Sequence, residues 1–378
     1  MSESIPFTRP TLDEQTIADV AEVLRSGWIT SGPKVRAFEA ALSEYFGGRR
    51  VRAFNSGTAT LEVALAMLGI GAGAEVITTP LTWVATANVI VRAGARPVFV
   101  DVDPRTRNID VERIAAAVTP ATRAILPVDL AGLPVDRDRL YALAAGHGLR
   151  VVEDAAQSMG ASWNGRRLGS FGDYVSFSFH ANKNMTTAEG GCLVLPADAD
   201  AALCERMRLQ GVARDADGGM DVDVFGGKFN LTDLAAAIGL NQLRHIDAFN
   251  ARRRELARRY LDQLAEAAPR LGLELPPGDF SQSNWHMFQV CLPLDRLTLT
   301  RGDFIRAMAA EGIAVGVHYP ALHLFTAYRA LGFVPGSFPH AERIGREIVT
   351  LPMFPALRED QVDRVCHTMI DILTRHRA

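Results

Sequence analysis

Cysteine is scarce in this 378-residue sequence, which contains only Cys192, Cys204, Cys291 and Cys366. These residues lie far apart and form no Cys-x-x-Cys pair, whereas disulfide frameworks and cysteine metal sites use closer, repeated spacings. We therefore expect four reduced, buried thiols that pack as small apolar residues. Because unpaired thiols are usual where disulfides do not form, the sequence predicts a cytoplasmic protein.

An excess of charge of one sign is also missing. Charged residues make up 22% of the sequence and the formal net charge is −3, so we expect neither nucleic acid nor a membrane as a partner. No apolar run approaches the roughly 20 residues that span a bilayer. Residues 1–10 have no basic region followed by an apolar block, so we expect no signal peptide.

Short apolar runs that alternate with helical segments are the main feature between about residues 50 and 200. The runs are Glu75–Thr78, Arg96–Asp101, Ala124–Val128 and Arg150–Glu153, and helices are expected at 83–93 and 137–145. Strands that are apolar on both faces and alternate with helices indicate a parallel sheet covered on both sides. Ligands of such sheets bind at the carboxyl ends of the strands.

The pattern changes after Asn230, where helices are expected at 231–243 and 247–267. A strand at 285–292, a helix at 301–311 and a strand at 313–317 follow. This order is typical of an α+β region. We place the domain boundary in the second of the two helices, which predicts a large domain at 1–250 and a smaller C-terminal domain at 251–378.

Lys183 follows the expected strand Tyr174–Phe179 and precedes Glu189-Gly190-Gly191. Ordinary lysines lie on polar helix faces. A lysine with a buried stem and an amine that faces a cleft has a lowered pKa, which suits Schiff-base formation. From this segment alone, a plain loop lysine is an equally good interpretation.

Asp154 directly follows the strand 150–153, at the carboxyl end of a parallel strand. A carboxylate there can pair with a pyridinium nitrogen and keep it protonated, which makes pyridoxal phosphate an electron sink. The alternative is a strand-end aspartate that caps the next helix. Glu153 is expected to point to the opposite face of the sheet.

Three further positions fit a flat phosphorylated cofactor. Asn55–Thr58 precedes an expected helix at 59–68, and short polar residues at a helix N-terminus favour a phosphate, although they also form ordinary caps. Trp83 is placed to stack on a ring, and Ser178 to donate a hydrogen bond to the phosphate. All of these residues lie at strand ends of one sheet, so coincidence of the whole set is less expected than coincidence of each part.

Two other clusters suggest different functions. The arginines at 252–254, 258 and 259 are interleaved with Glu255 and have no aromatic platform, which favours a solvated helix face or a dimer contact over a nucleic-acid site. His318, Tyr319 and His323 follow a strand but have no third ligand at metal-like spacing. We therefore predict no metal, and a substrate pocket at these three residues.

The order of these motifs resembles the DegT/DnrJ/EryC1/StrS sugar aminotransferases, within fold type I of the pyridoxal phosphate enzymes. The motifs cover nearly the whole chain: Gly27–Pro33, Phe54–Ala59, Glu153–Gln157, Ser176–His180, Lys183-Asn184, Glu189–Gly191, Phe229–Asp233 and Val317–Pro320. The resemblance implies a mostly parallel mixed sheet covered by helices, with a smaller α+β C-terminal domain. The most specific resemblance is to the 4-amino-4-deoxy-arabinose type.

The resemblance also implies a role for each matching residue. Lys183 carries pyridoxal phosphate as a Schiff base and acts as the general base, and Asp154 pairs with the pyridine nitrogen. His318 matches a substrate-binding position. Asn230 reaches the phosphate of the partner subunit's cofactor, which implies a homodimer with shared active sites. The remaining cofactor contacts are Gln157 at the ring hydroxyl, Trp83 on the ring face, and Gly57, Thr58 and Ser178 at the phosphate.

The implied activity is a ping-pong transfer of an amino group, with glutamate as the expected donor, to a nucleotide-linked keto sugar. The stretch Asp129–Pro134 favours the 4-keto over the 3-keto position. Some relatives carry histidine in place of the lysine and act as dehydratases, so Lys183 favours transamination. A pyridoxal phosphate-dependent lyase or dehydratase on the same scaffold stays open, as does a non-catalytic binding or regulatory homologue.

Overall fold

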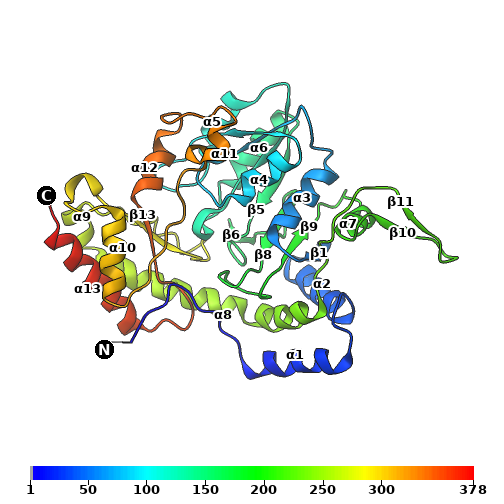
Figure 1. Cartoon of the computed structure of the whole chain (residues 1–378), viewed down its shortest axis with the longest axis horizontal. Helices are drawn as coiled ribbons and strands as arrows, with labels where there is room; N and C mark the ends of the chain where they lie inside the picture. The colour runs from blue at the N-terminus through cyan, green and yellow to red at the C-terminus, as the bar shows by residue number, and fades with distance from the viewer. Residues whose placement is uncertain (1–2) are drawn as a thin grey trace.

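A seven-stranded sheet organises the larger part of the computed structural model, which describes residues 3–378 (Figure 1). Its strand order is β1-β9-β8-β5-β4-β2-β3. Neighbouring strands are parallel except at β9, which is antiparallel to both β1 and β8. The strands are β1 (Val51–Phe54), β2 (Glu75–Thr78), β3 (Arg96–Phe99), β4 (Thr122–Leu126), β5 (Arg150–Asp154), β8 (Tyr174–Ser178) and β9 (Gly191–Val194). The expected α/β architecture with a mostly parallel mixed sheet is confirmed.

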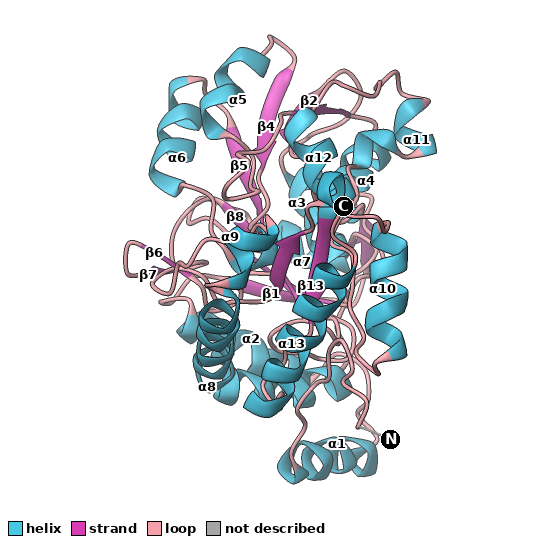
Figure 2. Cartoon of the chain, turned by 90° about the vertical axis from the view of Figure 1, so that its left-hand side faces the viewer, coloured by secondary structure: helices cyan, strands magenta, loops and turns pink. Residues whose placement is uncertain are grey.

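Helices cover both faces of this sheet (Figure 2). Because successive strand residues point to opposite faces, Val76 packs with one set of helices and Ile77 with the other. The first set is α3 (Gly57–Met67), α4 (Ala85–Arg92) and α7 (Ala201–Arg208). The second set is α5 (Val111–Ala117) and α6 (Arg137–Gly146), continued over β1, β8 and β9 by α2 (Pro33–Tyr45) and the start of α8.

One continuous helix, α8 (Asp233–Leu264), stands where two helices were expected. Residues 244–246 contain no glycine or proline, and Ile246 is buried against the sheet side of the helix, so nothing interrupts the helical backbone. The second half of α8 packs against the C-terminal core through Leu256 and Tyr260. The helix thus joins both cores, and the boundary placed at residue 250 stays a prediction.

The C-terminal region builds its own core around two antiparallel strands, β12 and β13. The strand expected at 313–317 is wrong, because Ile313 bridges only to Ile5 and Gly316 only to Thr350. The strand at 285–292 is shortened because Trp285 has a positive φ of 53°, which interrupts extended backbone. The elements are α9 (Ala267–Leu271), β12 (Phe288–Cys291), α10 (Arg301–Ala310), α11 (Thr326–Arg329), α12 (Pro339–Glu347), β13 (Ile348–Leu351) and α13 (Glu359–Arg375).

The arginine cluster on α8 does not form one solvated face. Arg253 is only 2% exposed, and its Nη1 donates to the carbonyl oxygens of His286 and Met353, both at 3.0 Å. Arg259 forms an ion pair with Asp363 on α13. The solvated-face interpretation is therefore wrong for Arg253, whose guanidinium satisfies carbonyls inside the C-terminal core.

Smaller elements complete the fold. The helix α1 (Glu14–Ser26) packs on α8, and the hairpin of β10 (Val212–Arg214) and β11 (Met220–Val222) projects from the molecule (Figure 1). The strands β6 (Ser162–Trp163) and β7 (Arg166–Arg167) form a short ladder. All four cysteines are buried and unpaired. Within residues 3–378, no helix combines the length and apolar character needed to cross a bilayer.

Candidate active site

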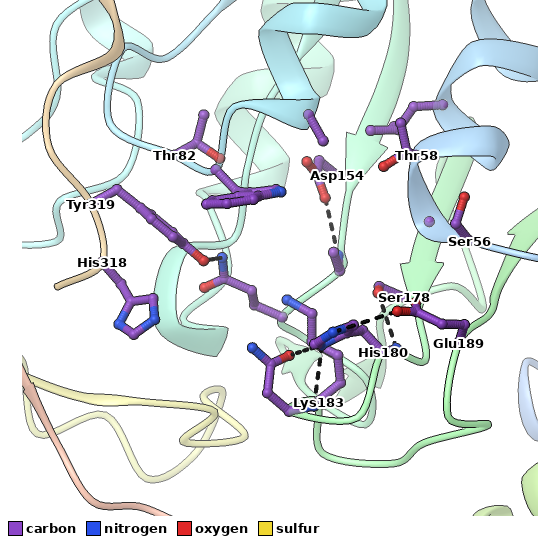
Figure 3. Close-up of a pocket in the computed structure, with 17 residues that line it drawn as sticks. Ser56, Thr58, Thr82, Asp154, Ser178, His180, Lys183, Glu189, His318 and Tyr319 are labelled. Atoms are coloured by element: carbon purple, nitrogen blue, oxygen red, sulfur yellow. Dashed lines mark hydrogen bonds and ion pairs between the residues drawn. The ribbon is translucent and has the colours of Figure 1, made fainter. Parts of the chain in front are cut away.

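A cavity of about 470 Å³ lies at the edge of the sheet where the parallel strands end (Figure 3). Figure 3 shows Asp154 on one side of it and Lys183 on the other, with His318 and Tyr319 at one end and Ser56, Thr58 and Ser178 at the other. Nine of the residues selected from the sequence line this cavity: Gly57, Thr58, Trp83, Asp154, Gln157, Ser178, Lys183, His318 and Tyr319.

Lys183 lies in the turn that follows β8, where its backbone N–H donates to the carbonyl of His180. The next residue, Asn184, is buried and anchors this turn: its Nδ2 donates to Asn250 on α8 at 2.7 Å, and its Oδ1 lies 2.9 Å from Nδ1 of His286. Burial lowers the pKa of Lys183 to about 8, while the negative charge of Asp154 opposes this shift. A larger share of neutral amine than an ordinary lysine has suits attack on an aldehyde.

Asp154 ends β5 and is 7% exposed. Its Oδ2 accepts a hydrogen bond from Thr86 Oγ1 at 2.7 Å, and its Oδ1 accepts from the backbone N–H of Ala156 at 3.2 Å. Burial raises the pKa of Asp154, and the bond from Thr86 is the strongest of the effects that oppose this rise. The carboxylate therefore faces the pocket from a site built to orient it.

Glu153 points to the opposite face of the sheet, as expected. Its carboxylate pairs with Arg137 at 2.8 Å and accepts from the Tyr141 hydroxyl on α6. Arg137 also contacts both oxygens of Asp129, at 2.9 and 2.8 Å. This buried network shares no side chain with the pocket, which leaves Asp154 as the strand-end acid that faces it.

The start of α3 forms the end of the pocket that is suited to an anion. Ser56 Oγ accepts from the backbone N–H of Ala59 at 3.1 Å and caps the helix. A Cβ on Gly57 would lie 2.9 Å from the Cβ of Ser178, so only glycine lets the helix approach β8 this closely. Unpaired N–H groups of a first helical turn and the hydroxyls of Thr58 and Ser178 together suit a phosphate.

Aromatic rings form one wall of the pocket. Trp83 is 57% exposed, which is unusual for tryptophan, and its ring lies 5.8 Å from that of Tyr319. Gln157 Nε2 donates to the Tyr319 hydroxyl at 3.4 Å, while its Oε1 accepts from the backbone N–H of Ala131 at 2.7 Å. Trp83 is therefore open on the pocket side, and Gln157 is held in place from two elements.

His318 extends from the C-terminal region into the pocket. Its Nδ1 lies 2.9 Å from Thr350 Oγ1, and its ring stacks on Phe7 at 5.1 Å. Burial, and next the charge of Lys183, lowers the pKa of His318 to about 4. The ring is thus neutral at physiological pH and offers Nε2 as a hydrogen-bonding atom.

Two of the selected residues lie outside the pocket. His323 is fully buried, its Nε2 lies 2.9 Å from Glu342 Oε1 on α12, and it does not line the cavity. It therefore does not serve as a substrate-facing residue of this cavity. Asn230 donates to Ser31 Oγ at 2.6 Å, and its role toward a partner subunit stays a prediction.

Sequence reasoning missed several residues that line the pocket or support its lining residues from behind. His180 lines the rim, with Nδ1 2.8 Å from Asn182 Oδ1 and Nε2 3.7 Å from Glu189. Thr86 was concealed within an expected helix, although its place one turn after Trp83 was a signal. Phe7 had no signal, because nothing local connects it to His318.

The family of the chain follows from its match to known proteins. A model of the DegT/DnrJ/EryC1/StrS aminotransferase family matches residues 10–370. The chain belongs to this family. Membership confirms the fold type I architecture, transaminase activity and pyridoxal phosphate as the cofactor, and it favours transamination over the lyase and the non-catalytic alternatives.

Individual relatives cover almost the whole chain. An uncharacterized protein of Methanocaldococcus jannaschii, MJ1066, is 38% identical over 99% of this chain and 98% of its own. The putative sugar aminotransferase Spr1654 from Streptococcus pneumoniae, in its PMP form, is 32% identical, with a TM-score of 0.93 over 98% of this chain and 99% of its own. S. venezuelae DesV, solved with a ketimine intermediate, is 34% identical, with a TM-score of 0.90 over 98% and 99%.

The residues of the pocket fit pyridoxal phosphate. Gly57 lets the start of α3 pack closely against Ser178, which places the Thr58 and Ser178 hydroxyls at one end of the cavity for a phosphate. Asp154 supplies a buried carboxylate for the ring nitrogen, and Lys183 supplies the amine for the aldehyde. Trp83 offers an exposed ring face. Each functional part of the cofactor thus has a chemically matching side chain in one cavity.

Proposed function

We propose that this aminotransferase moves an amino group from glutamate to C4 of a nucleotide-linked keto sugar, as a homodimer with shared active sites. The observation that carries the proposal is the single cavity in which Lys183 and Asp154 face each other between an anion-binding end and the His318–Tyr319 end. Two of the similar structures support a sugar substrate: Spr1654 is described as a putative sugar aminotransferase, and Helicobacter pylori PseC, 27% identical, as an aminotransferase of pseudoaminic acid biosynthesis.

Pyridoxal phosphate supplies an aldehyde for the amine and a protonated ring that stabilises negative charge at the reacting carbon. Lys183 would bind that aldehyde, and its free amine would take the proton from the carbon that bears the amino group and deliver a proton to the aldehyde carbon of the cofactor. With a pKa of about 8 instead of 10.5, the neutral amine is roughly three-hundredfold more abundant at pH 7. Asp154 would pair with the ring nitrogen and keep it protonated.

The end of the cavity that His318 and Tyr319 line suits an uncharged sugar. Neutral His318 and the Tyr319 hydroxyl offer hydrogen bonds without net charge. Among the described residues that line the cavity there is no arginine, and Lys183 is the one lysine. Glutamate and a nucleotide are both anionic, so their recognition requires cations from elsewhere, which supports a site completed by a second subunit.

The substrate test is a panel of nucleotide-linked 3-keto and 4-keto sugars with glutamate as donor, read by mass. A nucleotide-linked 4-keto pentose comes first, because the resemblance to the 4-amino-4-deoxy-arabinose type and the Asp129–Pro134 stretch favour it. We expect an amino sugar from a 4-keto acceptor. The Asp129–Pro134 stretch does not line the cavity. Turnover of 3-keto sugars alone would contradict the proposed C4 position but not the proposed amino transfer.

The donor half-reaction is tested without any sugar. Incubation with glutamate is expected to convert the cofactor to its pyridoxamine form and to release 2-oxoglutarate in equal amounts. If another amino acid releases its keto acid and glutamate does not, that amino acid is the donor in place of glutamate. Absence of the half-reaction with every amino donor would contradict the proposed chemistry.

A further inference from the structure

Thr86 is a fully buried residue in the first turn of α4, with no assigned role. Its Oγ1 lies 2.7 Å from Asp154 Oδ2 and 3.0 Å from Thr82 Oγ1. Thr82 and Asp154 line the cavity, whereas Thr86 does not. Figure 3 shows these two lining residues on the same side of the pocket, away from Lys183. Thr86 therefore acts on the pocket through its neighbours.

The direction of these hydrogen bonds follows from the charge of Asp154. An ionised carboxylate only accepts, so Thr86 donates its single hydroxyl proton to Asp154. Thr86 Oγ1 then has only lone pairs left for Thr82, so Thr82 donates to Thr86. The result is a directed chain, Thr82 to Thr86 to Asp154, in which each bond polarises the next.

This chain meets a specific need of the Asp154 site. Burial raises the pKa of Asp154 and favours the neutral acid, which cannot hold a proton on the ring nitrogen. Among the described residues, Thr86 is the one side chain that donates to this carboxylate; the other donor is the longer bond from the backbone N–H of Ala156. A hydrogen bond to the charged form favours that form.

We propose that Thr86 is a positioning residue of the cofactor site, whose hydroxyl, aligned by Thr82, fixes the Asp154 carboxylate toward the pyridine nitrogen. The inference rests on the proposed role of Asp154. The same turn also carries Trp83, because the backbone N–H of Thr86 donates to the Trp83 carbonyl at 3.2 Å. One turn of chain thus sets both the contact to the ring face and the contact to the ring nitrogen.

The test compares Thr86→Val, which keeps the shape and removes the hydroxyl, with Thr86→Ser, which keeps the hydroxyl. The matched control is Thr78→Val, since Thr78 is equally buried and its Oγ1 donates at 2.7 Å to the carbonyl of Leu126, away from Asp154. The holoenzymes carry pyridoxal phosphate labelled with 15N in the ring, and the 15N chemical shift reports protonation of that nitrogen. Cofactor affinity is titrated on the apo proteins.

We expect Thr86→Val to move the 15N shift toward the unprotonated ring and to lower kcat of the glutamate half-reaction by about 10- to 100-fold, with KM changed much less, as for loss of a hydrogen bond to a charged group. Thr86→Ser restores the shift and most of kcat. Thr78→Val keeps the wild-type shift. If Thr86→Val does not fold, Thr82→Val tests the same chain one step away, with a smaller change of the same sign.

The inference is overturned if the 15N shift and kcat of Thr86→Val match those of Thr78→Val. If Thr86→Val does not fold, it is overturned when the 15N shift and kcat of Thr82→Val match those of the wild type. An Asp154→Ala holoenzyme distinguishes failure of the Thr86 inference from failure of the proposed function. If Asp154→Ala also keeps the wild-type 15N shift, the role of Asp154 itself is wrong. If Asp154→Ala moves the shift while Thr86→Val does not, only the role of Thr86 is wrong.

Discussion

Phe7 stacks on His318 with 5.1 Å between ring centroids and 18° between ring planes, although 311 positions separate them in the sequence. The neighbouring Ile5 bridges to Ile313, which leads into the same loop. The N-terminal segment therefore supports the end of the pocket assigned to the sugar. Thr350 completes the support at Nδ1 of His318.

Replacing Phe7 by alanine is expected to raise KM for the sugar by about 3- to 10-fold, the amount that one aromatic contact supplies, with little change in kcat of the glutamate half-reaction. Phe7→Leu keeps the apolar bulk, and its KM for the sugar is expected to lie between those of the wild type and Phe7→Ala. Steady-state kinetics with each substrate varied separately measures this. A lower melting temperature with unchanged KM would mean that Phe7 acts only on stability.

His318 and His323 form a matched pair of variants. His318→Ala is expected to raise KM for the sugar by about tenfold, because it removes a hydrogen-bonding group from the cavity. His323→Ala removes the buried partner of Glu342 and is expected to lower the free energy of unfolding by roughly 2 kcal/mol while KM stays unchanged. Kinetics and urea unfolding of both variants decide this; a raised KM in His323→Ala would place His323 in the substrate site.

The lowered pKa of Lys183 predicts how cofactor loading depends on pH. Only the neutral amine forms the Schiff base, so the rate of loading onto apo protein should rise with pH and level off above about 8, instead of rising toward the ordinary lysine pKa. The charge of Asp154 opposes the shift, so Asp154→Asn should move the midpoint to lower pH. Stopped-flow absorbance measures this, and a midpoint near 10 in the wild type would disprove it.

Shared active sites predict complementation between two inactive variants. Lys183→Ala lacks the amine, and Asn230→Ala lacks the side chain expected to reach the partner's cofactor. A mixed dimer has one site with both wild-type residues, so a randomly exchanged equal mixture should regain about a quarter of the wild-type sites. Activity after exchange of subunits is the measurement. If Asn230→Ala is fully active alone, or the mixture stays inactive although mixed dimers form, the shared-site proposal fails.

Part of the candidate site was predictable because it depends on local order along the chain. Asp154 ends a strand that is apolar on both faces, Ser178 ends a strand that alternates polar and apolar residues, and Lys183 follows the second strand. Parallel strands bring their carboxyl ends to one edge of a sheet, so alternation of strands and helices was enough to place these residues near one another. The alternation of side chains between the two faces of a strand also explains the correct orientation of Glu153.

Other features depended on contacts that sequence proximity does not reveal. His323 is five residues from His318, yet it is fully buried and contacts Glu342, which is distant in the sequence. Arg253 has charged neighbours in the sequence but buried carbonyls around it in the fold. The two expected helices within 231–267 are one, because packing on both cores continues the helix where the pattern weakened.

By itself, the sequence determined the α/β order, the strand-end positions of Lys183 and Asp154, and the chemical kinds of side chain available to a cofactor. Only the tertiary structure decided which long-range partners set their state: Thr86 on Asp154, Phe7 and Thr350 on His318, and Asn184 beside Lys183. The physical reason is that burial and hydrogen bonding set the pKa and the orientation of a side chain. Both depend on segments that meet only when the chain is folded.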